Sequence, residues 1–227
     1  RDRLHREYRL PGQQMTISVL VPVKNLDIAK SRLAGVLSWN ERRVFADSML
    51  SDVVEAILKT PKIENVFLVG DKQLSPKPGT LVIQEQFNNG YNEAISFALK
   101  DKRIANSDAI LILPGDIPLI TTEEIKNFIT DTPKNGVRIA PDRDKEGTNA
   151  LLLAPPTQIK TQFGKLSYYR HLELAEKYCS NVEVIDSDGI AFDIDSPEDL
   201  KDFCGTVSCT KSYEFLQRNG IVASLLG

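Results

Sequence analysis

Short apolar runs alternate with longer amphipathic stretches along most of this chain. The runs are rich in Val, Ile and Leu and are bounded by polar or proline-containing segments, which is typical of buried strands. The stretches between them repeat apolar residues at helical spacing. Strands are therefore expected at 17–23, 66–69, 81–83, 109–113, 136–140, 149–154 and 182–185.

Capping residues mark where the helices should begin. Ser38, followed three residues later by Glu41, is a capping-box pattern and opens a long helix whose apolar positions extend to Leu58. Ser196 followed by Pro197 opens a late helix, because proline is favoured in the first turn. The chain beyond that helix is expected to be a short, weakly patterned tail. Further helices are expected at 92–100, 123–129 and 167–178.

This alternation of strands and helices predicts the fold class. Parallel strands need crossover connections, so the pattern indicates a Rossmann-like α/β fold with a mainly parallel sheet and helices on both faces. With 227 residues and no break in composition, we expect one domain spanning 15–227. Residues 1–14 are polar and strongly charged, and we expect them to be an N-terminal extension or a tag remnant.

Composition narrows the classes of partner. The 28 basic residues nearly balance the 31 acidic ones, so no overall field favours nucleic acid or an anionic membrane. No apolar run approaches the ~20 residues that span a bilayer, and no signal-peptide pattern opens the chain. Cys179, Cys204 and Cys209 form no Cys-x-x-Cys pair, which favours reduced thiols. We therefore expect a cytoplasmic protein.

Three acids stand out as candidate metal ligands. Asp116 follows the apolar run 110–113 through a Pro-Gly turn, and open α/β sheets bind ligands at the carboxyl ends of their strands. Asp193 and Asp195 also follow a predicted strand, and their alternation turns both carboxylates to one side of an extended segment. Each acid could instead cap a turn. Their convergence favours a Mg²⁺ site, since this ion binds one or two carboxylates together with phosphates.

The loop after the first strand carries three cations, Lys24, Lys30 and Arg32. It lacks the glycines of a dinucleotide fingerprint or a Walker loop, so side chains rather than backbone amides would bind phosphate there. The three cations are suited to neutralising a triphosphate. An ordinary solvated basic loop is the alternative.

Two later loops offer groups for a small-molecule oxygen. Thr148 and Asn149 carry a hydroxyl and an amide, and Gly164 and Ser167 precede or open a predicted helix, where anions bind readily. Such residues are also common in loops, and a serine at this position often only caps its helix. His171 lies on the same predicted helix, and a lone histidine on a helix is more often a packing or surface residue than a catalyst. No Ser/His/Asp or Cys/His arrangement is present, so the chemistry should not need a base.

Five sequence blocks occur in order between about Met15 and Leu200. They are 22–33 with Ala29-Lys30-Ser31-Arg32-Leu33, Pro114-Gly115-Asp116-Ile117-Pro118, Gly147-Thr148-Asn149-Ala150, 163–171 with Phe163-Gly164, Ser167 and His171, and Asp193-Ile194-Asp195-Ser196-Pro197 to Leu200. Together they resemble the CofC/FbiD guanylyltransferases, which act in biosynthesis of the deazaflavin coenzyme F-420. The joint occurrence of the blocks is far more specific than any one of them.

The resemblance implies a GT-A-type nucleotidyltransferase that transfers GMP from GTP to phosphoenolpyruvate or 2-phospho-L-lactate and releases pyrophosphate. The matched residues are Asp116, Asp193 and Asp195 for the metal, Lys24, Lys30 and Arg32 for the triphosphate, and Thr148, Gly164 and Ser167 for the acceptor. The segment 85–92, with Gly90 and Asn92, is expected to contact guanine. Here Tyr91 replaces the Leu common in the family, and Glu146 replaces a frequent Gly.

Several alternatives stay open. The acceptor could be 3-phospho-D-glycerate, because few contacts distinguish such similar acids. A sugar-phosphate or molybdenum-cofactor nucleotidyltransferase would share the sheet and the acids but favours a Gly-rich first loop. A non-catalytic nucleotide-binding domain would not need all three acids. A homodimer is only a base-rate expectation.

Overall fold

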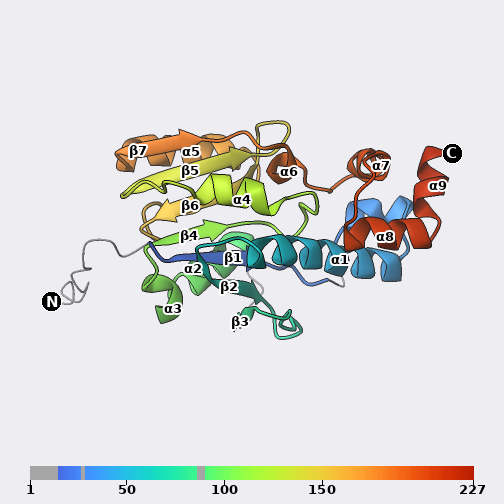
Figure 1. Ribbon diagram of the computed structural model, residues 1–227, viewed down its shortest axis with the longest axis horizontal. Coiled ribbons are helices and arrows are strands. Elements are labelled where there is room, and N and C mark those ends of the chain that lie inside the picture. The colour runs from blue at the N-terminus through green and yellow to red at the C-terminus, as the bar shows by residue number, and fades with distance from the viewer. Residues whose placement is uncertain (1–14, 27–28, 86–89) are drawn as a thin grey trace.

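A seven-stranded sheet forms the centre of the molecule (Figure 1). The computed structural model describes residues 15–26, 29–85 and 90–227. The strands are β1 (Ile17–Pro22), β2 (Ile63–Gly70), β3 (Leu81–Gln84), β4 (Ala109–Ile112), β5 (Gly136–Pro141), β6 (Thr148–Ala154) and β7 (Asn181–Val184). Each predicted strand is present, and the boundaries differ from the prediction by a few residues at most.

Local capping places the main helices where the sequence predicts them. Ser38 accepts a hydrogen bond from the Glu41 amide, while the Glu41 side chain accepts one from the Ser38 amide. Ser196 caps a later helix in the same way, with Asp199 as its reciprocal partner. The elements are η1 (Ser31–Gly35, a 3-10 helix), α1 (Trp39–Leu58), α2 (Tyr91–Ala98), α3 (Lys102–Ala105), α4 (Thr122–Ile129), α5 (Ser167–Tyr178), α6 (Asp188–Ala191), α7 (Pro197–Gly205), α8 (Lys211–Arg218) and α9 (Ile221–Leu226).

The sheet has the order β3-β2-β1-β4-β6-β5-β7. β1 pairs in parallel with β2 and β4, β2 pairs in parallel with β3, and β5 pairs in parallel with β7. The predicted mainly parallel sheet is therefore confirmed. The exception is β6, which is antiparallel to both neighbours and forms a hairpin with β5. Because β6 runs backwards, its first residues lie at the edge where the parallel strands end.

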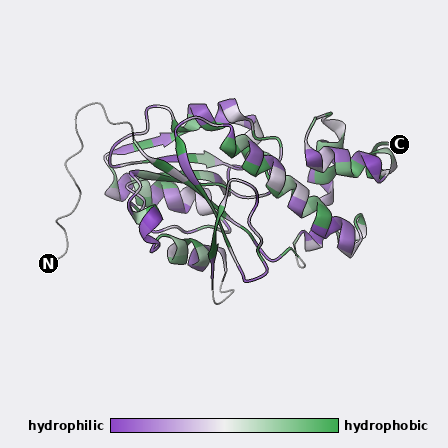
Figure 2. Ribbon diagram, turned by 60° about the horizontal axis from the view of Figure 1, so that its bottom comes forward, coloured by the Kyte–Doolittle hydropathy of each residue, from purple (hydrophilic) through white to green (hydrophobic). Residues whose placement is uncertain are grey.

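Each face of the sheet has its own layer of helices, as predicted. α1 and α4 cover one face with apolar side chains such as Val53 and Phe128. α2, α3 and α5 cover the other face, where Ile95 and Ala175 are fully buried. Figure 2 shows hydrophobic colour concentrated along the strands and alternating with polar colour along the helices. This pattern is expected for a sheet buried on both sides by amphipathic helices.

The chain after α7 is not a weakly patterned tail, so that prediction is wrong. Residues 211–226 form α8 and α9, which lie with α7 at the end of the molecule beside α1 (Figure 1). Tyr213, Leu216 and Ile221 join a third apolar cluster with Phe45 and Met49 of α1. Both helices are short, so their packing against the apolar stripe of α1 explains why they fold there.

Replacing Leu216 by Ala should test this third cluster. Leu216 is fully buried, so the change is expected to lower the free energy of unfolding by about 2–5 kcal/mol through lost burial and a residual cavity. Leu226→Ala is the matched control, because that leucine is half exposed and its loss should cost less than about 0.5 kcal/mol. Urea denaturation measures both changes. Equal, small losses in the two variants would contradict the packing described here.

The structure bears on three further predictions, which concern the N-terminal extension, the cysteines and a membrane span. The extension 1–14 lies outside the described residues, and so do positions 86–89 of the expected guanine-contacting segment. Cys179, Cys204 and Cys209 are free thiols, as expected. None of the helices in the described part of the chain combines the length and the apolar character that crossing a bilayer requires.

Candidate active site

The predicted acids meet at the edge of the sheet where the parallel strands end. Asp116 lies in the turn after β4, and Asp193 and Asp195 lie in the segment between α6 and α7. The backbone joins them directly, because the Ile194 amide donates to the Asp116 carbonyl oxygen at 3.1 Å. Lys30, from the loop after β1, joins these acids. Residues more than 160 positions apart in sequence therefore meet at one place.

Lys30 bridges two of the three acids. Its Nζ lies 2.6 Å from Asp116 Oδ2 and 2.7 Å from Asp195 Oδ1, and its side chain is only 7% exposed. Burial alone would lower the pKa of Lys30, but the two carboxylates outweigh burial and raise it, so the side chain stays a cation. The Lys30 backbone is left-handed, with φ 54°. Such a conformation costs a non-glycine residue about 1 kcal/mol or more, which the two ion pairs help to offset.

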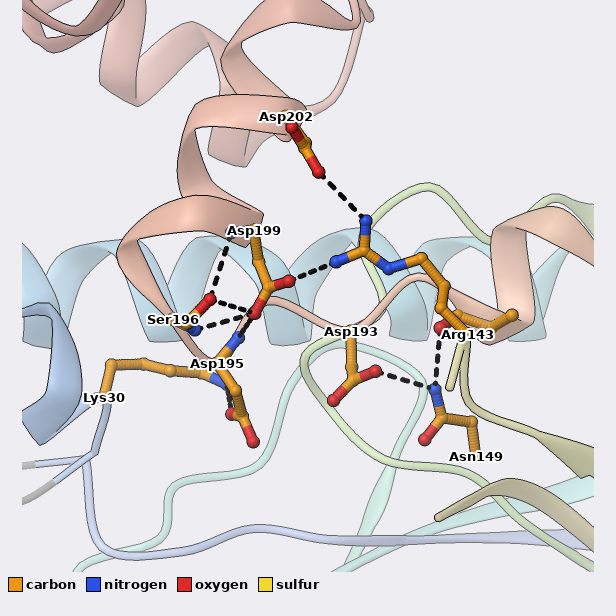
Figure 3. Close-up of polar contacts among 9 residues, drawn as sticks. Lys30, Arg143, Asn149, Asp193, Asp195, Ser196, Asp199 and Asp202 are labelled. Atoms are coloured by element: carbon orange, nitrogen blue, oxygen red, sulfur yellow. Dashed lines mark hydrogen bonds and ion pairs between the residues drawn. The ribbon is translucent and has the colours of Figure 1, made fainter. Parts of the chain in front are cut away.

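Asp193 is held by Asn149, the second residue of β6. Asn149 Nδ2 donates to Asp193 Oδ1 at 3.1 Å (Figure 3). It also approaches the backbone carbonyls of two α6 residues. Burial, with a smaller contribution from the negative charges of Asp116 and Asp195, raises the pKa of Asp193 to about 6 against the opposing effect of the Asn149 hydrogen bond. A second cation near Asp193 would relieve this repulsion.

The backbone of Asp195 is fixed by the cap of α7. Asp199 Oδ2 accepts hydrogen bonds from the amides of Asp195 and Ser196, at 3.0 and 2.7 Å (Figure 3). Arg143, from the β5–β6 loop, pairs with the other oxygen of Asp199 and with Asp202. Burial alone would raise the pKa of Asp195, but nearby cations, Lys30 first among them, lower it. The Asp195 carboxylate is therefore ionised and well oriented.

The three acids do not form a ready-made metal site. Among the described residues, no three acidic, imidazole or thiol side chains are close enough to hold a metal ion by themselves. The ammonium group of Lys30 lies between Asp116 and Asp195. Magnesium usually needs only one or two carboxylates when substrate phosphates and water supply its other ligands. The acids are therefore candidate ligands for a cation that arrives with a phosphate.

A cleft opens above Asp116 and Lys30, between the β1 loop and the start of α2. Lys24 stands at its side, and the charges of Lys24 and Arg32 both reach Asp195, whose pKa they help to lower. The three predicted cations thus converge on the predicted acids. The residues that line the cleft include Pro22, Lys24, Lys30, Tyr91, Asp116 and Asp195.

The predicted acceptor residues lie on the β6 side of this edge. Thr148 opens β6 and is buried, and its hydroxyl lies 3.0 Å from His171 Nδ1 on α5. Ser167 begins α5, and Gly164 in the preceding turn has φ 113°, a conformation that glycine adopts without strain. The Tyr168 amide donates to the Glu146 carbonyl oxygen and joins this turn to the β5–β6 loop. Two predicted acceptor loops therefore lie side by side.

Gly90 and Asn92 have different surroundings. Gly90 precedes α2 with φ 105° and lines a hollow together with Glu85 and Tyr91. Asn92 instead pairs with the backbone of Phe163, donating to its carbonyl at 2.9 Å and accepting from its amide at 2.8 Å. Asn92 thus holds the turn before α5. A nucleotide contact for either residue stays a prediction.

Two contacts of the site could not be predicted from the sequence. Tyr91 lines the cleft beside Asp116, and burial together with that carboxylate raises the pKa of its phenol. Arg143 reaches Asp199 across the edge of the sheet. The Ser196-x-x-Asp199 spacing is a capping pattern and could have identified Asp199. Arg143 stands among several charged loop residues, so nothing in the sequence singles it out.

The buried His171 predicts a pH dependence of stability. Burial, with a smaller effect of Arg170, lowers the pKa of His171 from 6.5 to about 4, so the folded protein resists a proton that the unfolded chain accepts. The free energy of unfolding of the wild type should therefore fall by about 3 kcal/mol, relative to that of His171→Gln, as the pH is lowered from about 7 to about 4. Urea denaturation of both proteins across this range measures the difference. A difference that does not change with pH would contradict the neutral, buried imidazole.

Comparisons with known proteins identify the family of the chain. Residues 17–225 match the model of the family described as guanylyl transferase, CofC-like. A phosphoenolpyruvate guanylyltransferase of Sphaerobacter thermophilus is 35% identical over 199 residues, covering 84% of this chain and 94% of that protein. A 2-phospho-L-lactate guanylyltransferase of Methanocaldococcus vulcanius is 31% identical over 208 residues, covering 89% and 91%.

Solved structures show the same fold at low sequence identity. A Desulfovibrio desulfuricans G20 protein assigned as a nucleotide-diphospho-sugar transferase superposes with a TM-score of 0.70 at 15% identity, covering 93% of this chain and 99% of that one. At that identity the likeness shows the fold alone. The family match covers residues 17–225 and so includes every block that forms the edge described above, and the two relatives extend over most of the sequence. The chain therefore belongs to the CofC-like guanylyl transferase family.

Proposed function

We propose that this protein transfers GMP from GTP to phosphoenolpyruvate or 2-phospho-L-lactate, with release of pyrophosphate, in the biosynthesis of coenzyme F-420. The observation that carries the proposal is the convergence of Lys30 with Asp116 and Asp195 at the mouth of a cleft, beside a separate polar pair of loops. The relatives named after these two reactions support the choice of acceptors. The protein would act in the cytoplasm on small molecules.

The residues present fit a divalent cation. Asp116 and Asp195 are oriented by hydrogen bonds and ion pairs, and Asp193, with a pKa raised to about 6, gains from added positive charge. These three acids would hold Mg²⁺ together with phosphate oxygens. When bound, the ion would polarise the α-phosphoryl group and orient the two substrates.

The protein's own side chains supply charge and position. Lys24, Lys30 and Arg32 would contact the triphosphate and stabilise the charge on the departing pyrophosphate. An oxygen of the acceptor phosphate attacks the α-phosphorus of GTP, a new P–O bond forms, and the bond to the β-phosphate oxygen breaks. The attacking oxygen is already anionic at neutral pH, so no general base is needed. Thr148, Asn149, Gly164 and Ser167 would hold the acceptor in line.

A coupled assay for pyrophosphate tests the proposal. The protein is mixed with GTP and Mg²⁺, and phosphoenolpyruvate, 2-phospho-L-lactate and 3-phospho-D-glycerate are supplied separately and then in competition. Release with one of the first two acids is expected to exceed release with glucose 1-phosphate, the acceptor that a sugar-phosphate enzyme would use. No release with any phosphorylated three-carbon acid would refute the proposed function. Preference for 3-phospho-D-glycerate would correct the acceptor alone.

A further inference from the structure

His171 is the most completely enclosed polar side chain near the acceptor loops. It has no exposed surface, and both of its ring nitrogens are engaged. Nε2 accepts a hydrogen bond from the Gln162 backbone amide at 2.8 Å, and Nδ1 lies 3.0 Å from Thr148 Oγ1. The Phe163 ring packs edge-on against the imidazole, with 4.8 Å between centroids. The ring is therefore fixed in one orientation.

The Gln162 amide determines which nitrogen carries the proton. A backbone N–H can only donate, so Nε2 must be the unprotonated acceptor nitrogen. The proton of the neutral ring then resides on Nδ1, which must donate to the Thr148 oxygen. A ring turned over by 180° would place carbon atoms against both partners and lose both hydrogen bonds. A doubly protonated ring would place N–H against N–H, which is consistent with burial lowering the pKa of His171 to about 4.

This assignment has a consequence for Thr148. Its oxygen accepts from His171, so its hydroxyl hydrogen must point elsewhere. Within the described part of the chain, the contact with His171 is the only hydrogen bond of that hydroxyl. Thr148 adjoins Asn149, which holds Asp193, and the loop before its strand is hydrogen-bonded to the start of α5 through Glu146 and Tyr168. The hydroxyl is thus prepared as a donor at the place proposed for an anionic acceptor.

We propose that His171 is a positioning residue that turns the hydroxyl hydrogen of Thr148 away from the imidazole, so that Thr148 donates to an oxygen of the phosphorylated acid. The inference rests on the proposed function and adds a residue that does not itself touch substrate. A donor orientation suits phosphate and carboxylate oxygens, which only accept hydrogen bonds. The imidazole already uses one of the two lone pairs of the hydroxyl oxygen, so fewer acceptor positions remain for a ligand that donates hydrogen bonds.

Two substitutions test the hydrogen bonds of the two ring nitrogens of His171 separately. His171→Gln places an amide near the Nε2 position, so it can keep the contact with Gln162 while it loses the donor to Thr148. His171→Asn places an amide near Nδ1, so it keeps that donor and loses the other contact. His171→Gln is expected to raise the acceptor KM about tenfold or more, with kcat and the KM for GTP nearly unchanged. His171→Asn should recover most of the acceptor affinity while lowering the thermal midpoint.

A double-mutant cycle with Thr148→Val completes the test. That change removes the hydroxyl, so adding His171→Gln should raise the acceptor KM no further. An equal additional increase in the Thr148→Val background would overturn the inference, as would lower thermal midpoints in both His171 variants without a change in KM. Wild-type pyrophosphate release is measured first. An inactive wild type refutes the proposed function, whereas an unchanged acceptor KM in an active His171→Gln protein refutes only the role of His171.

Discussion

Asp116→Asn is expected to lower kcat about 1,000-fold while leaving the fold intact. The change keeps the size of the side chain but removes a charge that pairs with Lys30 at 2.6 Å and that the proposed function assigns to the metal. Losing a preorganised charge at the reacting phosphate costs about 10²–10³ in rate, and a lost metal ligand adds to that. Steady-state pyrophosphate release at saturating GTP and acceptor measures the effect.

Asp101→Asn is the matched control. Asp101 also pairs with a cation, Arg103, but it caps α3, at the opposite ends of the strands from the acids. Asparagine caps helices about as well as aspartate, so this variant should keep nearly full activity. Circular dichroism and the thermal midpoint report on the fold of both proteins. If Asp116→Asn kept more than about a tenth of wild-type kcat, the assignment of Asp116 to the metal would fail.

Lys30→Met is expected to lower kcat/KM for GTP about 100-fold. Methionine keeps the length of the stem but removes the ammonium group that lies between Asp116 and Asp195. Two carboxylates then repel each other without compensation, and the triphosphate loses a cation that the proposed function gives it. Initial rates over a range of GTP concentrations at fixed, saturating acceptor give the ratio.

Lys59→Met provides the comparison for Lys30→Met. Lys59 pairs with Glu55 at 2.7 Å at the end of α1 and is mostly exposed, so its ion pair contributes little and lies away from the cleft. The kcat/KM for GTP of the Lys59→Met protein should match the wild-type value. A Lys30→Met protein whose ratio stays within about twofold of wild type would show that the Lys30 ion pairs are structural only.

The parts of the fold that depend on local patterns could be predicted. The apolar runs identify the strands, and the Ser38–Glu41 box places the start of α1, because a strand face and a cap are encoded within a few adjacent residues. α8 and α9 could not be predicted in this way. Leu216 is one of few apolar residues on a mostly polar helix, and it acquires a partner only once α1 is in place. The antiparallel direction of β6 likewise depends on pairing that no short pattern reveals.

In the site, too, some features follow from local sequence patterns and others depend on tertiary contacts. Asp116 and Asp195 could be brought together from the sequence, because strand ends meet at a known edge of an α/β sheet. The position of Lys30 between them could not, since it depends on a left-handed backbone at a lysine, a conformation that propensity does not favour. The two hydrogen bonds of His171 could not be predicted from the sequence either. They require β6, α5 and the turn at 162 to lie together, and a lone histidine in sequence gives no indication of that.

The reversed direction of β6 has a consequence for how such enzymes diversify. The proposed nucleotide side of the site is built on loops that follow parallel strands, and each of those loops must lead into a crossover helix. The proposed acceptor side begins with the β5–β6 hairpin, whose loop connects adjacent strands directly and meets helices only where Arg143 pairs with Asp199 and Glu146 accepts from Tyr168. If the proposed roles hold, substitutions between these contacts in one hairpin would alter the choice of acid while the loops proposed to bind GTP keep their crossover helices.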